Sequence, residues 1–234
     1  MDRLPALLFL LLISVSPLVP AWIWFRMKKY GSLRFMLSVL AGLLSVIIAG
    51  IIQLILSPDL NSQVQMRDII FGVFVRVSLI EESSRAIVLF ALFHFIPYSR
   101  IILNKNKPDE PQAAVNPAQF FGAPSGLVAG LGFAAVENIF YGIGNPGAVY
   151  LRFFTAFLHG ACGARIGSAL SLFREQPVIA ASQFIAAVLI HGIYNICILN
   201  PGVPWFLSAF IALSAFMSSV MSIYFNDPNF SIKK

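Results

Sequence analysis

Apolar stretches of about 20 residues follow one another along nearly the whole chain, with short polar segments between them. A helix of that length crosses a hydrocarbon core about 30 Å thick. We place seven such helices, at residues 4–25, 35–56, 69–95, 121–143, 149–173, 178–199 and 205–225. The pattern therefore predicts an all-α polytopic membrane protein, with residues 1–234 forming a single transmembrane domain.

The composition supports a membrane protein and argues against a soluble domain. Of the chain, 58% is hydrophobic and 11% is charged, whereas soluble domains contain roughly 25% charged residues. The net charge of +6 would suit nucleic-acid binding, but Lys and Arg also collect in the cytoplasmic loops of membrane proteins. We therefore expect the lipid bilayer, and no nucleic acid, as a partner.

The basic residues sort to one side of the predicted bundle. Most of them lie in the loops after the first and third apolar stretches and near the C-terminus, whereas Arg3 and Arg67 lie on the opposite side. The positive-inside rule then places the N-terminus outside and the C-terminus in the cytoplasm. The first stretch ends in Trp22, Trp24 and Phe25 before a basic segment, which is typical of a retained helix end rather than a cleaved signal peptide.

A few ionisable residues lie deep inside the predicted helices, where a charge costs at least about 2.5–3.5 kcal/mol and is usually functional or tightly paired. Counted from the external ends of their helices at about 1.5 Å per residue, Glu81 lies ~18 Å deep, His159 ~15 Å, His191 ~12 Å and Glu137 ~9 Å. Glu82 follows Glu81 in the same helix. We therefore predict one polar site, enclosed by the helices in the outer half of the bilayer.

Neighbouring positions suggest how these groups are held. Arg85 lies four residues after Glu81 and so shares its helix face, which predicts an ion pair between them. Asn195 lies one turn after His191. Small residues that recur every four positions predict close helix packing. They are Gly126, Gly130 and Ala134 in one helix, and Gly160, Ala164 and Ser168 in another.

The residue types exclude several kinds of intramembrane protease. No serine lies in a suitable nucleophile motif, no aspartate lies deep in a span, and no histidine is followed by glutamate as HExxH requires. A carboxylate and imidazoles remain. A glutamate could act as general base on a water molecule while a His or Asn donates to the oxyanion. Alternatively, His159 and His191 with Glu81 or Glu137 could bind zinc. The residue types leave both possibilities open.

Four segments resemble motifs of the PrsW family of bacterial intramembrane proteases. Residues 81–85 (Glu-Glu-Ser-Ser-Arg) resemble its EExxK/R motif, and residues 130–141 resemble its GxGFAxxENxxY segment. Residues 152–159 resemble its Arg…His helix, and residues 191–195 its HGxxN helix. The segments occur in the family's order within a core of about residues 69–199. The pattern is similar, more distantly, to the CAAX prenyl endopeptidases and the CPBP group, whose EExxxR motif is one residue longer.

The resemblance implies a peptidase in the bacterial inner membrane that cuts a single-pass membrane protein near its external side. In PrsW relatives this substrate is an anti-sigma factor. The implied enzyme uses a glutamate-activated water and needs no metal. A zinc-dependent protease with the same residues is the first alternative. The second is a non-proteolytic relative that acts as a scaffold, immunity protein or transporter.

The resemblance also implies a role for each residue of the predicted site. Glu81 would be the base, assisted by His159. Glu82 would be a second essential acid or a partner that shifts the pKa of Glu81, although either glutamate could be the base. His191 and Asn195 would form the oxyanion site. The two orienting residues would be Glu137 and Arg85.

Overall fold

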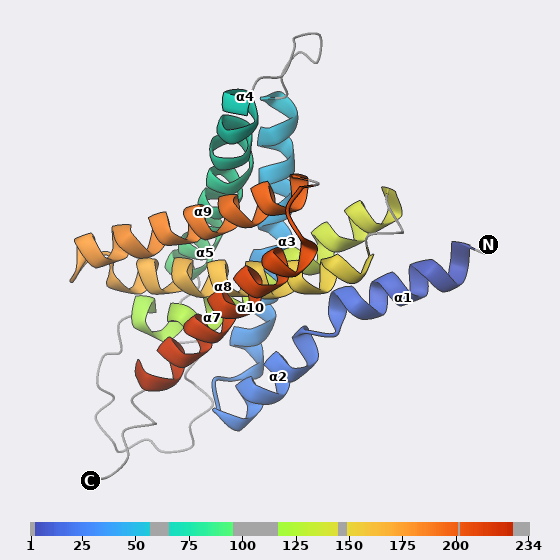
Figure 1. Cartoon of the computed structure of the whole chain (residues 1–234). Coiled ribbons are helices and arrows are strands. Elements are labelled where there is room, and N and C mark those ends of the chain that lie inside the picture. Colours follow the sequence, from blue (N-terminus) through green and yellow to red (C-terminus); the bar gives the residue numbers. More distant parts are fainter. Residues whose placement is uncertain (1–2, 57–65, 96–116, 145–148, 201, 227–234) are drawn as a thin grey trace, which may run out of the picture.

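The computed structural model describes residues 3–56, 66–95, 117–144, 149–200 and 202–226. Within these ranges every regular element is a helix (Figure 1), which confirms the predicted all-α fold. The helices are α1 (Arg3–Val15), α2 (Leu18–Met27), α3 (Ser32–Ile55), α4 (Met66–Phe71), the π-helix η1 (Gly72–Leu79), α5 (Ile80–Phe95), α7 (Pro117–Gly144), α8 (Val149–Leu172), α9 (Pro177–Leu199) and α10 (Trp205–Asn226).

Among the described residues, five helical stretches are long and apolar enough to cross a membrane. They are Leu8–Met27, Ser32–Ile55, Gly122–Ile143, Pro177–Leu199 and Trp205–Phe225. The other two predicted spans, 69–95 and 149–173, are also helical, and they contain most of the ionisable residues of the predicted site. The chain is therefore a multi-pass membrane protein whose charged helices lie among more apolar ones.

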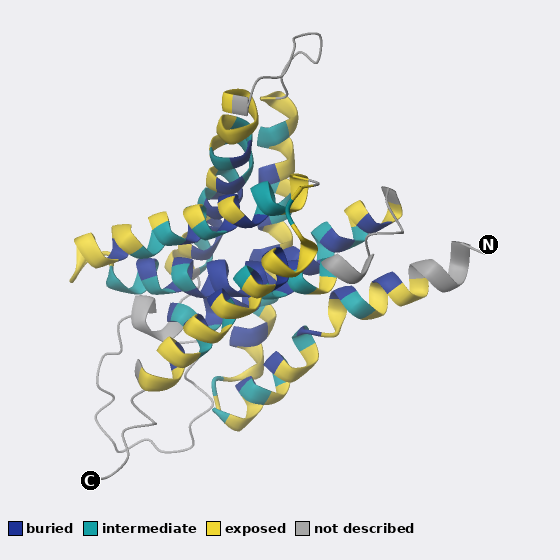
Figure 2. Cartoon of the chain, in the orientation of Figure 1, coloured by how far each residue is buried: buried dark blue, intermediate teal, exposed yellow. Residues whose placement is uncertain are grey.

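Burial follows the pattern expected of a bundle surrounded by lipid. Figure 2 shows buried residues where α3, α5, α7 and α8 meet, and exposed residues along the outer sides of the helices. The exposed residues include large apolar ones, such as Leu54 at 76% and Val178 at 81% exposure. An apolar surface this extensive is suited to hydrocarbon rather than water.

The first predicted span is interrupted, which the sequence analysis missed. Residues 4–25 were expected to form one helix, but α1 ends at Val15 and α2 begins at Leu18. Pro17 lies at the junction. Because proline lacks a backbone N–H and restricts the preceding residue, it ends a helix at about this position. The two halves can therefore run in different directions, as Figure 1 shows.

The segment before the predicted glutamate pair is also irregular. Residues Gly72–Leu79 form η1, which continues directly into α5. In a π-helix each N–H bonds five residues back, and such segments occur frequently at functional sites. The π-helix ends just before Glu81, so the widened turns set the angle at which Glu81 and Glu82 enter the bundle.

The helices α7 and α8 pack closely through glycines. A Cβ atom built on Gly126 would collide with the backbone of Gly163, and one on Gly130 would collide with the carbonyl of His159. The small residues predicted to pack closely on α7 therefore lie in this contact. On α8, however, Gly163 and Gly167 make the close approach, whereas the predicted Gly160 faces Leu131 and Phe216 side chains. The two backbones are thereby held close together at the level of the site.

Candidate active site

Four helices bring six of the predicted site residues together. Helix α5 contributes Glu81, Glu82 and Arg85, while Glu137 comes from α7, His159 from α8 and His191 from α9. All but Glu137 are at most 5% exposed, and the Glu137 side chain is 16% exposed. The rings of His159 and His191 lie 4.9 Å apart, edge to face. Residues on four separate helices therefore form one buried cluster.

Glu82 has a partner for each of its carboxylate oxygens. Its Oε2 accepts a hydrogen bond from the guanidinium of Arg85, and both side chains are fully buried. Its Oε1 lies 2.8 Å from Nδ1 of His191. Because an ionised carboxylate can only accept, Nδ1 of His191 must carry a proton in this contact. The other ring nitrogen of His191, Nε2, is then directed toward Glu81.

The predicted partner of Arg85 was wrong. The spacing of four residues favoured an ion pair with Glu81, but Arg85 pairs with Glu82, three residues away. The guanidinium also lies 4.5 Å from the ring centre of Phe133 on α7, a distance that allows a cation–π contact. Arg85 is thus held between a carboxylate and an aromatic face, and it leaves Glu81 to other partners.

Both nitrogens of His159 are engaged. Arg85 donates from Nη2 to Nδ1 of His159 over 3.1 Å, since a guanidinium has no acceptor. Nδ1 must therefore carry a lone pair, and in the neutral ring the proton is on Nε2. That nitrogen lies 2.5 Å from Oε2 of Glu137. His159 thus connects Arg85 to Glu137, as expected for a histidine that Glu137 orients.

Glu81 differs from its neighbour because one of its oxygens remains available. Its Oε1 accepts a hydrogen bond of 3.0 Å from the Gln53 amide on α3. Its Oε2 is buried, makes no hydrogen bond, and lies 3.7 Å from Nε2 of His191. Since a buried polar atom usually has a partner, this oxygen and the facing imidazole define the position where a small polar molecule could bind.

Gln53 is a contact of Glu81 that the positions of the ionisable residues did not predict. Its signal in the sequence is an amide among the apolar residues that end α3. An amide within an apolar stretch of a membrane helix needs a hydrogen-bonding partner much as a charge does. Its position opposite Glu81 requires α3 to pack against α5, which the structure shows.

Other polar residues within the spans lie outside the cluster. Asn195 is half-buried one turn after His191, and among the described residues no hydrogen bond joins it to the cluster. The deep Arg165 donates to Gln183 on α9 and Ser218 on α10 instead. Arg152 lies over the ring of Tyr141. Within the part of the chain that the structure describes, no hydrogen bond or ion pair joins Arg152 or Arg165 to the cluster.

A metal ion would need ligand atoms that are close together and free of protons. Glu81, His159 and His191 each offer one potential ligand atom within 4.8 Å of the others. Glu81 and His191 suit this role, because Glu82 binds Nδ1 of His191 as a carboxylate outside a zinc shell commonly does. His159 does not, because its Nδ1 accepts from Arg85 and its Nε2 then carries the proton. The set therefore does not fit a three-ligand metal site as arranged.

The fold and cluster together define a polytopic membrane protein with a buried site of carboxylates and imidazoles. The family model of the PrsW family intramembrane metalloproteases matches residues 32–223, and the chain therefore belongs to this family. The protein is thus an intramembrane peptide hydrolase that acts on membrane proteins, which confirms the resemblance seen in the motifs. Comparisons with curated proteins and with solved structures gave no significant match.

Proposed function

We propose that this protein is a glutamate-dependent endopeptidase in which Glu81 activates the attacking water. The observation that supports this most strongly is the buried Oε2 of Glu81, which has no hydrogen-bond partner and faces Nε2 of His191 at 3.7 Å. One water molecule can contact both atoms. Glu82 is unsuited to this task because both of its oxygens are already engaged.

The proposed reaction proceeds without a covalent enzyme intermediate. Glu81 takes a proton from the bound water as its oxygen attacks the peptide carbonyl carbon, and a tetrahedral oxyanion forms. The protonated Glu81 then gives this proton to the amide nitrogen as the C–N bond breaks. The carboxylate is regenerated, and the products are a new carboxyl terminus and a new amine.

His191 is the candidate donor to the oxyanion. When its ring carries both protons, Nε2–H can donate to the developing negative charge while Nδ1–H remains bonded to Glu82. A carboxylate behind a histidine stabilises the imidazolium in serine proteases in the same way. Asn195, one turn away on α9, is a second donor once a substrate carbonyl enters the site.

We assign Arg85, His159 and Glu137 mainly to positioning. Arg85 neutralises Glu82, and His159 links Arg85 to Glu137. This series of contacts joins α5, α8 and α7, so it fixes the helices that present Glu81. Glu137 is the most exposed of the three carboxylates and marks the side from which water can reach the site.

The substrate we propose is a single-pass membrane protein of the anti-sigma-factor type, cut near the external face of a bacterial inner membrane. The family resemblance supports this substrate class. The distribution of basic residues supports an external N-terminus and a cytoplasmic C-terminus.

The decisive experiment compares Glu81→Gln with wild type in nanodiscs mixed with solubilised membrane proteins. New peptide N-termini should appear with wild type and not with the variant. On a peptide from such a site, Glu81→Gln should lower kcat about 10²–10⁴-fold, which is the contribution of a general base. Asp68→Asn, which alters an exposed carboxylate outside the cluster, is the control and should cleave normally. Equal cleavage by Glu81→Gln and wild type would refute the proposal.

The zinc-dependent alternative has support from the family's description and from the cluster of Glu81, His159 and His191. A chelator separates the two proposals. We expect dialysis against EDTA and 1,10-phenanthroline to leave the cleavage rate unchanged, because His159 lacks a free lone pair for a metal. Complete loss of activity that zinc restores would establish a metalloprotease. If wild type cleaves nothing, the non-proteolytic alternative is favoured.

A further inference from the structure

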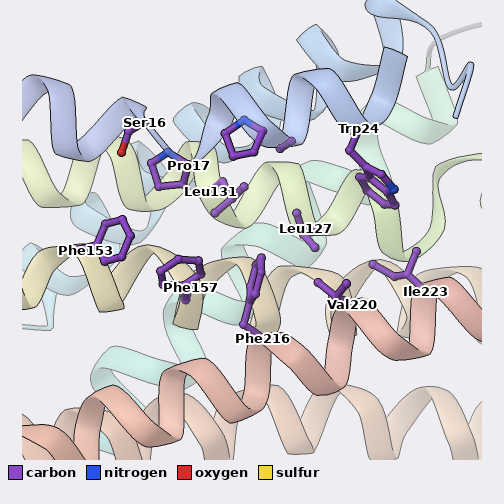
Figure 3. A pocket seen from close by; sticks show the side chains of 12 residues that line it. Ser16, Pro17, Trp24, Leu127, Leu131, Phe153, Phe157, Phe216, Val220 and Ile223 are labelled. Atoms are coloured by element: carbon purple, nitrogen blue, oxygen red, sulfur yellow. The ribbon is translucent and has the colours of Figure 1, made fainter. Parts of the chain in front are cut away.

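An apolar groove lies on the side of α7 and α8 turned away from the candidate active site. Its volume is about 320 Å³. Figure 3 shows Leu127 and Leu131 of α7 between two long walls, formed by the α1–α2 segment and by α10. The leucines are buried, whereas Ser16, Pro20 and Phe153 at the edge are exposed. The groove is therefore open to the surface along one side.

The lining of the groove is almost entirely hydrocarbon. Among the residues that form it, only Ser16 and Trp24 have a polar side-chain atom, and three phenylalanines and two prolines add broad apolar surfaces. Such a lining offers no means of holding a polar ligand. It suits an aliphatic chain, which needs shape and dispersion contacts only.

A membrane offers two kinds of apolar ligand, the acyl chain of a lipid and a helix of another membrane protein. Both are apolar along their length, so the lining of the groove does not choose between them. The charge at one end of the groove does, because a lipid carries its phosphate next to its acyl chain.

One end of the groove is basic. Trp24 lies at the end opposite Ser16 (Figure 3), and Lys28 follows it by one helical turn, with its N–H bonded to the Trp24 carbonyl at 2.9 Å. The next residue, Lys29, is exposed, whereas Arg26 is directed toward Ser32 and the Trp22 ring. Tryptophans and basic residues together are typical of the level of lipid headgroups. A phosphate at this end would meet positive charge while its acyl chain enters the groove.

We propose that the groove binds one acyl chain of an anionic phospholipid whose phosphate contacts the basic end of α2. This inference rests on the groove and its charged end, and it is independent of the proposed peptidase mechanism. The wall from Ser16 to Trp24 precedes the region matched by the family model, residues 32–223. The lipid site therefore lies partly outside the family core.

The test uses Trp24 as a reporter. Replacing the other two tryptophans, by Trp22→Phe and Trp205→Phe, leaves its fluorescence alone in the chain. The protein is placed in nanodiscs with increasing fractions of phosphatidylglycerol or phosphatidylcholine brominated on the acyl chains. Quenching by phosphatidylglycerol should saturate at a lower fraction than quenching by phosphatidylcholine. Adding Lys28→Gln should reduce that preference about fivefold, the effect of one basic residue near an anionic surface.

A second pair of variants tests whether the groove itself binds the chain. Val220→Phe on α10 fills the groove and should abolish the saturable quenching, whereas Met217→Phe, at an exposed position on the same helix, should not. Melting followed by circular dichroism verifies that both variants fold. Three results would overturn the proposal: linear quenching unaffected by Val220→Phe, equal affinity for the two headgroups, or displacement of the lipid by a transmembrane peptide.

Discussion

The two faces of the α7–α8 pair have opposite chemistry, although the residues that line them are only two positions apart in the sequence. Phe157 lines the apolar groove, and His159, two residues later on α8, belongs to the polar cluster. Leu131 and Phe133 divide between the two faces of α7 in the same way. Two residues correspond to about 200° around a helix. One helix pair therefore separates a charged site from a hydrocarbon surface by little more than its own thickness.

This difference shows which parts of the molecule depend on single atoms. On the polar face, each buried charge needs a partner at hydrogen-bond distance, because an isolated charge in the membrane is costly. On the apolar face, contacts are non-directional and depend mainly on volume. Substitutions that preserve size should therefore be harmful on the polar face and tolerated in the groove.

The largest effect on stability should come from Glu82→Gln. This substitution removes the charge that compensates Arg85, and leaving one member of a buried ion pair costs about 3–5 kcal/mol. Glu81→Gln should cost much less, because a glutamine can still accept from Gln53. Unfolding in SDS, followed by circular dichroism, compares the two. Equal midpoints would show that the polar face does not depend on the Glu82–Arg85 pair.

Asn195→Ala tests whether the polar face extends along α9 once substrate binds. If Asn195 donates to the oxyanion, kcat should fall about 10²–10³-fold with little change in KM. Steady-state cleavage in nanodiscs measures both constants. Cys197→Ala, a small change two residues further along the same helix, is the matched control. An unchanged kcat for Asn195→Ala would leave His191 as the sole proposed donor.

Gly126→Ala tests the contact that separates the two faces. Its new methyl group would collide with the backbone at Gly163, so we expect a loss of about 1–3 kcal/mol in stability from overpacking. Gly50→Ala is the matched control, because no atom lies within 4 Å of a Cβ there. It should be neutral or slightly stabilising, since alanine favours helices. Similar effects of the two substitutions would contradict the close α7–α8 packing.

The smallest effect should come from Gln53→Met, which retains the side-chain length but removes the donor to Glu81. A hydrogen bond to a charged group contributes about 1.5 kcal/mol or more, so kcat should fall roughly tenfold. KM and the melting temperature should change little. Gln53→Glu should be as slow as Gln53→Met, because an ionised glutamate cannot donate a hydrogen bond to Glu81. Gln183→Met removes an amide that contacts Arg165 outside the cluster. If both glutamine variants lose activity equally, Gln53 has no specific role.

The fold could largely be predicted because a membrane segment requires a long apolar run. What the runs did not reveal were local departures from regular helix. The interruption at Pro17 had a visible signal in that proline, whereas nothing in Gly72–Leu79 indicated a π-helix over an ordinary one. In the structure η1 packs against α9, a contact in the assembled bundle that the pattern of residues does not show.

The residues of the candidate site could be predicted more readily than their pairings. The free-energy cost of a charge inside a membrane, together with the estimated depth of each residue, singled out four residues: Glu81, Glu137, His159 and His191. The structure brings them together. The partner of Arg85 was wrong because spacings of three and four residues both place side chains on one helix face. In the structure Arg85 pairs with Glu82 while its guanidinium lies over the Phe133 ring. The spacing of residues in the sequence determines neither the side-chain rotamer nor this contact with another helix.

The position of the groove wall has a consequence for how this enzyme could be modified. The segment Ser16–Trp24 lies before the family match, while every member of the polar cluster lies within it. Substitutions at exposed positions of this segment, such as Ser16 and Pro20, therefore alter the groove without changing any residue of the cluster. Ala21 within the segment and Phe25 just after it are buried in the core against α3 and α7. For an engineer, the groove wall is thus adjustable at its exposed positions, whereas its buried positions belong to the bundle.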